Sequence, residues 1–310
     1  MSVEEELSRL SPGRDTILAI GVFDGVHLGH KRLLAELVGR ARRLNLLSGV
    51  VTFAPHPQRL LSPQTELPFL TSLEQKKALL KDEGVKVVIV LPFSRELAQL
   101  SAREFVGLLK DYLGLKELVI GPGFTLGRNR EGNVTTLRKL GEDMGFTVTV
   151  VPGVRINGEI VSSTAVREAL AGGDLEKVHS LLGRPFSLRG EVVHGESRGA
   201  KLEYPTANLE IEPAQALPVE GVYATWAYIG GRAHESVTNI GRRPTFGGGK
   251  RVVEVYILGY RGNLYGKELK IDIIERLRGE KRFDSVEALR QQMARDIEQG
   301  RAVLSSKGRN

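Results

Sequence analysis

The chain has 310 residues, enough for two ordinary domains that each bury a hydrophobic core. Its apolar fraction of 41% and charged fraction of 26% are those of a soluble globular protein, and no apolar run approaches the roughly 20 residues of a membrane helix. Small phosphate-bearing partners explain the net charge of +7 at least as well as nucleic acid does, so no nucleic acid is expected as a partner. The short apolar runs likewise give no reason to expect a membrane as a partner. The absence of cysteine excludes disulfide and thiolate chemistry. It fits the cytoplasm, as does the acidic, charge-broken segment 1–10, which lacks the apolar core of a signal peptide.

The first unit along the chain is a buried strand, a glycine-rich turn and a helix. Apolar residues 17–20 run into a turn with Gly21, Gly25 and Gly29, and apolar residues then recur at helical spacing up to residue 44. A helix start has unpaired N–H groups and a partial positive charge, and glycine lets a ligand approach the main chain. His27 and His30 are three residues apart, so both imidazoles can face one bound phosphate.

Two other interpretations of this turn remain open. Asp24-Gly25 is also an ordinary turn dipeptide, and the histidine pair can be a surface feature. A metal site with His56 as third ligand is the other alternative, although no Cys or Glu stands nearby at the usual ligand spacing.

The rest of the first half alternates strands with helices. Residues 49–53 predict a second buried strand, and two prolines hold His56 at its carboxyl end, where open α/β sheets bind ligands. Capping boxes at Ser72 and Ser101 predict two helices. Further strands are expected at residues 85–91, 117–121 and 146–151. Helical connections imply right-handed crossovers, so the expected fold class is an α/β doubly wound parallel sheet.

Two later segments are candidates for ligand contacts. Residues 121–133, which include Phe124 and Thr125, are too glycine-rich for regular structure. Ser163 and Thr164 start a helix that stops at Gly172, where hydroxyls act as N-caps. The same hydroxyls, with Arg167 one turn on, can also hold a polyphosphate.

These motifs resemble those of a known family. Gly21-x-Phe23-Asp24-Gly25-x-His27-x-Gly29-His30 is similar to the nucleotide-binding signature of the HxGH nucleotidyltransferase superfamily, in particular the flavin adenylyltransferase half of bacterial bifunctional riboflavin kinase/FAD synthetases. The segments at 53–57 and 160–167 agree. The resemblance implies that His27 and His30 are catalytic, that the nucleotide is bound by Gly21, Phe23, Asp24, Gly25, Gly29, Ser163, Thr164 and Arg167, and that the flavin contacts His56, Phe124 and Thr125. Gly123 and Leu126 depart from the family, which has a polar and an aromatic residue there.

After a linker at residues 183–185 the pattern changes to short alternating runs. Strands are expected at residues 188–193, 222–229, 235–240, 252–258 and 270–274, and their spacing and glycine content predict an antiparallel β-barrel. A C-terminal helix should follow, with Asp284 and Glu287 as its capping box. Its packing face should consist of Val286, Leu289, Met293, Ile297 and Val303. We therefore expect two domains, residues 1–183 and 184–310.

The second domain carries one further motif. Pro205-Thr206-Ala207-Asn208 can be a simple turn, and Glu254 can be an exposed residue of an alternating strand. Residues 190–209, however, resemble the riboflavin kinase signature, with Ala200 and Glu203 in place of the usual Arg and Gly. The resemblance implies that Thr206 and Asn208 hold Mg²⁺ and the ATP phosphates and that Glu254 is the catalytic base. It further implies that Gly195, Arg198 and Lys201 contact the nucleotide and that Arg278 contacts the flavin.

The resemblance covers about residues 15 to 300. It implies that riboflavin and ATP give FMN and ADP in the barrel, and that FMN and ATP give FAD and pyrophosphate in the α/β domain. The implied small molecules are riboflavin, FMN, FAD and ATP, with Mg²⁺ accompanying ATP; homo-oligomerisation is left open. Two alternatives remain: an active kinase whose first domain is inactive or transfers a nucleotide elsewhere, and a flavin- or nucleic-acid-binding regulator on an inactive scaffold.

Overall fold

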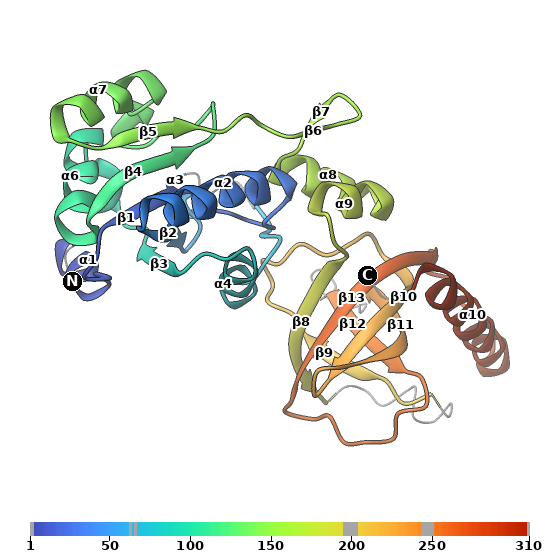
Figure 1. The fold of residues 1–310 in the computed structure, drawn as a ribbon. Coiled ribbons are helices and arrows are strands. Elements are labelled where there is room, and N and C mark those ends of the chain that lie inside the picture. Colours follow the sequence, from blue (N-terminus) through green and yellow to red (C-terminus); the bar gives the residue numbers. More distant parts are fainter. Residues whose placement is uncertain (1–2, 62–63, 65–66, 195–203, 243–250, 309–310) are drawn as a thin grey trace. The chain divides into compact units, whose positions relative to one another are not determined.

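The computed structural model describes residues 3–61, 64, 67–194, 204–242 and 251–308 (Figure 1). By its internal contacts the chain divides into two compact units, Met1–Ser163 and Thr164–Asn310. The domain boundary expected between residues 183 and 184 stays a prediction. Within the described residues no helix is long and apolar enough to span a membrane.

The first unit is built on a five-stranded sheet with strand order β3-β2-β1-β4-β5. Every strand pair is parallel, so the predicted doubly wound sheet is confirmed. The strands are β1 (Thr16–Ile20), β2 (Leu47–Ala54), β3 (Val87–Pro92), β4 (Leu115–Ile120) and β5 (Thr147–Val150).

Helices cover both faces of this sheet. Successive residues of β1 point to opposite sides and are all apolar after Thr16, so both faces need to be covered. Ile17 packs in one core cluster with the helices α2 (Leu28–Leu44) and α4 (Leu73–Asp82). Leu18 packs in a second cluster with α6 (Ala102–Leu113) and α7 (Val134–Met144). The capping boxes predicted at Ser72 and Ser101 are both present and start α4 and α6.

Several short elements of this unit were not predicted. They are α1 (Val3–Arg9), α3 (Pro57–Leu61), α5 (Arg95–Gln99), the 3₁₀ turn η1 (Arg128–Arg130), and the hairpin strands β6 (Arg155–Ile156) and β7 (Glu159–Ile160). Helix α7, capped by Asn133, was also missed. Most of them span too few residues to show a hydrophobic period.

The second unit begins at Thr164, the second residue of α8 (Ser163–Gly172), and continues through α9 (Leu175–Leu182) into a closed antiparallel barrel (Figure 1). The barrel order is β10-β11-β12-β9-β8-β13. Its strands are β8 (Phe186–Val193), β9 (Ala207–Glu210), β10 (Gly221–Ile229), β11 (Arg232–Arg242), β12 (Arg251–Ile257) and β13 (Glu268–Arg278). The predicted barrel is confirmed, and β9 is the strand that the sequence did not predict.

The C-terminal helix α10 (Val286–Lys307) packs against β10, β11 and β13. Its expected cap at Asp284 is wrong: the hydroxyl of Ser285 accepts from the backbone N–H of Ala288 at 3.1 Å. Val286 is also not part of the packing face, because it is 68% exposed. The buried positions are Asp296, Gly300 and Leu304, while the other four predicted positions are half-buried.

Candidate active sites

The turn between β1 and α2 brings the two predicted histidines together. His27 is the N-cap of α2, and its Nδ1 accepts from the backbone N–H of His30 at 3.3 Å. The two imidazole rings stack with centroids 3.7 Å apart, and the Phe23 ring lies 5.0 Å from that of His30. The start of α2 therefore presents both imidazoles beside its N-terminal N–H groups, which is the geometry of an anion site.

Glycines in this turn make room for the rings. A Cβ on Gly29 would lie 3.1 Å from the His27 ring, and a Cβ on Gly21 would lie 3.2 Å from the Phe23 ring. Gly25 has φ +78°, which a side chain would strain. The glycines thus accommodate the protein's own rings, a role that the sequence alone does not reveal.

Asp24 ties the turn to the segment before α4. Asp24 is only 4% exposed, and its carboxylate accepts from the backbone N–H groups of Leu70 at 2.9 Å and Thr71 at 3.1 Å. Its backbone carbonyl accepts from the hydroxyl of Ser163 at 2.8 Å. Ser163 therefore contacts the loop that carries the histidines, although 139 positions separate it from Asp24. Thr164 and Arg167 follow in α8 and belong to the second unit.

The His30 side chain lies in an environment that disfavours its charged form. Its Nδ1 is shielded from solvent and has no hydrogen-bond partner among the described residues. Burial, followed by the charges of His27 and Lys76, lowers the pKa of His30 well below 6.5. His30 is therefore a neutral imidazole near pH 7.

The predicted flavin contacts of this unit lie on loops at the carboxyl edge of the sheet. His56 follows β2, and its Nδ1 accepts from the backbone N–H of Gln58 at 3.2 Å. After β4, Phe124 is half-buried against the core, and the Thr125 hydroxyl accepts from Arg130 Nε at 3.1 Å. Leu126 is 8% exposed and packs into the same core, so the family's aromatic position is here an apolar core position.

In the barrel, strand pairing brings polar residues into one row. Asn208 of β9 lies directly opposite Glu254 of β12, and Glu254 lies opposite Asn239 of β11. Residues paired in register point to the same face of a sheet, so the three side chains are neighbours. Asn239 was not among the predicted site residues.

A cavity of about 210 Å³ is lined by Thr206 with its neighbours Pro205 and Ala207 and by residues 260–265. The ring of Tyr265 stacks on His194 at a centroid distance of 3.9 Å. The lining thus combines the Thr206 hydroxyl with the aromatic side chains of Tyr260 and Tyr265. The predicted contacts Gly195, Arg198 and Lys201 lie outside the described residues.

Arg278, a predicted flavin contact, is engaged in a buried ion pair. Its Nε and Nη2 donate to the two carboxylate oxygens of Asp296 at 2.8 and 2.7 Å. The two side chains are 16% and 5% exposed. This pair joins β13 to α10, and a contact of Arg278 with flavin stays a prediction.

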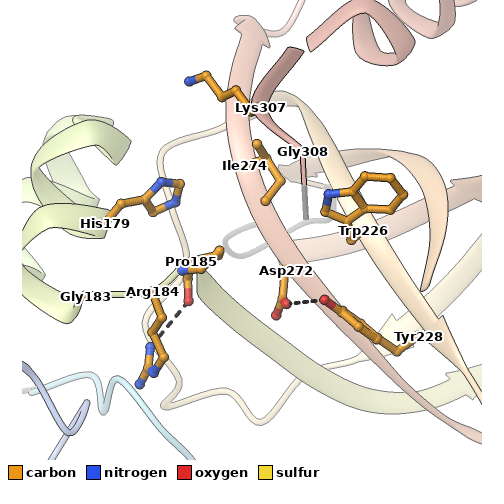
Figure 2. Close-up of a pocket in the computed structure, with 10 residues that line it drawn as sticks. All are labelled: His179, Gly183, Arg184, Pro185, Trp226, Tyr228, Asp272, Ile274, Lys307 and Gly308. Carbon is orange, nitrogen blue, oxygen red and sulfur yellow. Dashed lines mark hydrogen bonds between the residues drawn. The ribbon is translucent and has the colours of Figure 1, made fainter. Parts of the chain in front are cut away.

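A further cavity of about 200 Å³ lies on the barrel and is bordered by α9 and α10 (Figure 2). The Tyr228 hydroxyl donates to Asp272 at 2.7 Å, and Asp272 also accepts from Ser187 at 2.6 Å. Among the described residues, those lining this cavity include none of the predicted site residues. The part of the chain that the structure describes also holds no cluster of three or more His, Cys, Asp or Glu side chains fit for a metal ion.

Comparison with known proteins agrees with both halves of the fold. Residues 11–165 match the family model for FAD synthetase, and residues 182–304 match that for riboflavin kinase. The bifunctional riboflavin kinase/FMN adenylyltransferase of Pseudomonas fluorescens is 40% identical over 98% of both chains. That of Escherichia coli strain K12 is 39% identical over 92% of both chains.

A solved structure also resembles the whole chain. It is described as a macrolide-efflux protein from Streptococcus pneumoniae, is 30% identical, covers 95% of this chain and 96% of its own, and has a TM-score of 0.88. The two matched models, in this order, and the near-complete coverage of the relatives show that the chain belongs to the family of bifunctional riboflavin kinase/FMN adenylyltransferases.

Proposed function

We propose that the barrel phosphorylates riboflavin at the Glu254 row and that the α/β unit adenylylates FMN at the β1–α2 turn. The observation that carries the kinase half is the direct pairing of Asn208 with Glu254. For the other half it is the stacked pair His27 and His30 at the start of a helix.

In the kinase reaction, Glu254 accepts the proton of the riboflavin hydroxyl while that oxygen attacks the γ-phosphorus of ATP, and ADP leaves with the electrons of the broken P–O bond. Thr206 and Asn208 offer hydroxyl and amide oxygens, hard donors that fit Mg²⁺. Bound Mg²⁺ would offset the phosphate charge. Asn239, on the other side of Glu254, is placed to orient its carboxylate.

In the adenylyltransferase reaction, a phosphate oxygen of FMN attacks the α-phosphorus of ATP, and pyrophosphate leaves. His27, His30 and the first N–H groups of α2 donate hydrogen bonds to the phosphates as charge develops on them. Ser163 holds the loop. The family resemblance assigns Thr164 and Arg167 to the polyphosphate as well. No covalent intermediate is needed, because such a transfer depends mainly on positioning and charge stabilisation.

The remaining assignments are part of the same proposal. His56, Phe124 and Thr125 contact FMN in the first domain, residues 1–183. Gly195, Arg198 and Lys201 contact ATP in the second, residues 184–310, where Arg278 contacts the flavin. Both reactions use Mg²⁺ with ATP, take place in the cytoplasm and involve no nucleic acid; a homo-oligomer is compatible with all of them.

The test is chromatography of the products formed from riboflavin, ATP and MgCl₂. We expect FMN first and FAD after it, and neither when excess EDTA replaces free Mg²⁺. Glu254→Gln should stop FMN formation, whereas Glu268→Gln, at a side chain that is 62% exposed on the barrel, should leave it unchanged. FMN accumulation without FAD would refute the adenylyltransferase half, and full FMN formation by Glu254→Gln would refute the assigned base.

A further inference from the structure

Lys76 of α4 is a buried lysine for which the sequence gives no functional signal. It is 6% exposed, and its Nζ donates to the backbone carbonyl of Val22 at 3.0 Å. The next residue, Lys77, has a side chain that is 35% exposed and pairs with Glu74 at 3.0 Å in the usual manner of a surface lysine. Burial of an ammonium group is costly, and for packing alone an apolar side chain of the same volume would serve as well or better.

The contacts of Lys76 belong to a set that joins α4 to the turn after β1. The Asp24 carboxylate accepts from the N–H groups of Leu70 and Thr71, and the N–H of Gly25 donates to the Thr71 hydroxyl at 3.2 Å. Lys76 adds a further bond from α4 to this turn, at the backbone carbonyl of Val22. The turn is therefore held at Val22 and Gly25 through its backbone and at Asp24 through its side chain.

This turn needs such support because its backbone is strained. The backbone φ angles of Phe23 and Val26 are +51° and +40°, values that residues other than glycine rarely adopt. Strained residues persist only where surrounding contacts hold them, and they gather at functional sites. Here they set the path of the chain immediately before His27.

The charge of Lys76 also acts within the site. Burial lowers the pKa of Lys76, and the negative charge of Asp24 opposes that shift. Lys76 in turn is one of the groups that lower the pKa of His30. Asp24, Lys76 and the two histidines thus form one electrostatic group at the start of α2.

We propose that Lys76 is a positioning residue for adenylyl transfer: its buried ammonium holds the Val22 carbonyl and offsets Asp24, which keeps the turn in the conformation that presents His27 and His30 to the phosphates of ATP. The inference rests on the proposed function of this turn. Lys76 lies outside the motif at residues 21–30 and is not among the site residues that the family resemblance implies.

The experiment compares Lys76→Met with Lys77→Met in the full-length chain. Loss of a hydrogen bond from a charged donor should lower kcat for FAD formation from FMN by about 10- to 100-fold in Lys76→Met. The KM for ATP should change far less, because ground-state binding retains the helix start. Lys77→Met should match the wild type, and riboflavin phosphorylation by the same preparations should stay within about twofold in both variants.

Two further variants separate charge from packing. Lys76→Arg keeps the positive charge and should recover most of the activity that Lys76→Met loses. Lys76→Gln keeps a donor but no charge and should stay close to Lys76→Met. If Lys76→Met does not fold, the comparison of Lys76→Arg with Lys76→Gln still tests whether the positive charge is required.

A pH profile provides a readout that a purely structural role would not change. The titratable neighbours that act on Lys76 and His30 are Asp24 and His27. Without the Lys76 charge the pKa of His30 should rise, so the acid limb of kcat for FAD formation should move to higher pH in Lys76→Met and not in Lys77→Met. A lower melting temperature with unchanged kcat and pH profile would overturn the proposal, as would equal activities of Lys76→Arg and Lys76→Gln. If the wild type itself forms no FAD, the proposed function fails instead.

Discussion

The ion pair between Arg278 and Asp296 allows a quantitative test of how α10 is attached to the barrel. Asp296→Asn keeps the shape of the side chain but leaves the Arg278 guanidinium without its counter-charge. Both side chains are well shielded, at 16% and 5% exposed, and are joined by two hydrogen bonds. Breaking such a pair costs about 3 kcal/mol or more, which corresponds to a fall of about 10 °C in Tm for a unit of this size.

The chain provides its own probe for this measurement. Trp226 is the single tryptophan and packs in one apolar cluster with Leu304 of α10, so its fluorescence follows unfolding of the second unit. Glu275→Gln is the matched control, because Glu275 pairs with Lys307 between the same two elements at 2.7 Å but with side chains that are 39% and 53% exposed. That exposed pair should contribute less than about 1 kcal/mol.

A stabilising role of the buried ion pair is refuted if Asp296→Asn leaves the Trp226 transition unchanged or shifts it no more than Glu275→Gln does. In that case the buried pair would not hold α10.

Two further predictions concern the histidines. Gly29→Ala should reduce FAD formation at least tenfold, because the new Cβ would lie 3.1 Å from the His27 ring, whereas Gly39→Ala in the same helix meets only the end of a flexible side chain and should have no effect; equal activities would contradict this. Burial lowers the folded-state pKa values of His30 and His179 below 6.5, so the unfolded chain takes up more protons and stability should fall as pH drops below about 6.5. Replacing either histidine by glutamine should flatten the decline of Tm between pH 7 and pH 5.5 in its own unit, and an unchanged slope would show that burial does not hold that ring neutral.

Local patterns predicted the fold well where short-range physics decides the structure. The apolar run before Gly21 and the helical spacing after it identified β1 and α2, and the capping boxes at Ser72 and Ser101 located the starts of α4 and α6. Strand β9 was missed because Pro205, Thr206 and Asn208 favour turns. It forms a strand through its pairing with β8 and β12, which are distant in the sequence.

In the candidate sites, too, local motifs could be predicted from sequence and long-range contacts could not. Motif residues such as His27 and Glu254 are predicted from sequence, and their catalytic roles stay predictions; the contacts that hold them were not predicted. Lys76 looks like any surface lysine of a charged helix, and its burial depends on a loop some fifty residues earlier. Asp296 escaped the search for the α10 packing face because a carboxylate carries no hydrophobic signal, and only Arg278 of β13 explains its burial.

The presence of two independent active sites in one chain is tested most directly by two rates measured on two variants. With FMN and ATP supplied, His30→Ala should lose FAD formation by about 10²- to 10³-fold and keep its rate of riboflavin phosphorylation. Glu254→Gln should lose riboflavin phosphorylation and still convert supplied FMN to FAD. Loss of both activities in either folded variant, or of neither, would contradict the account.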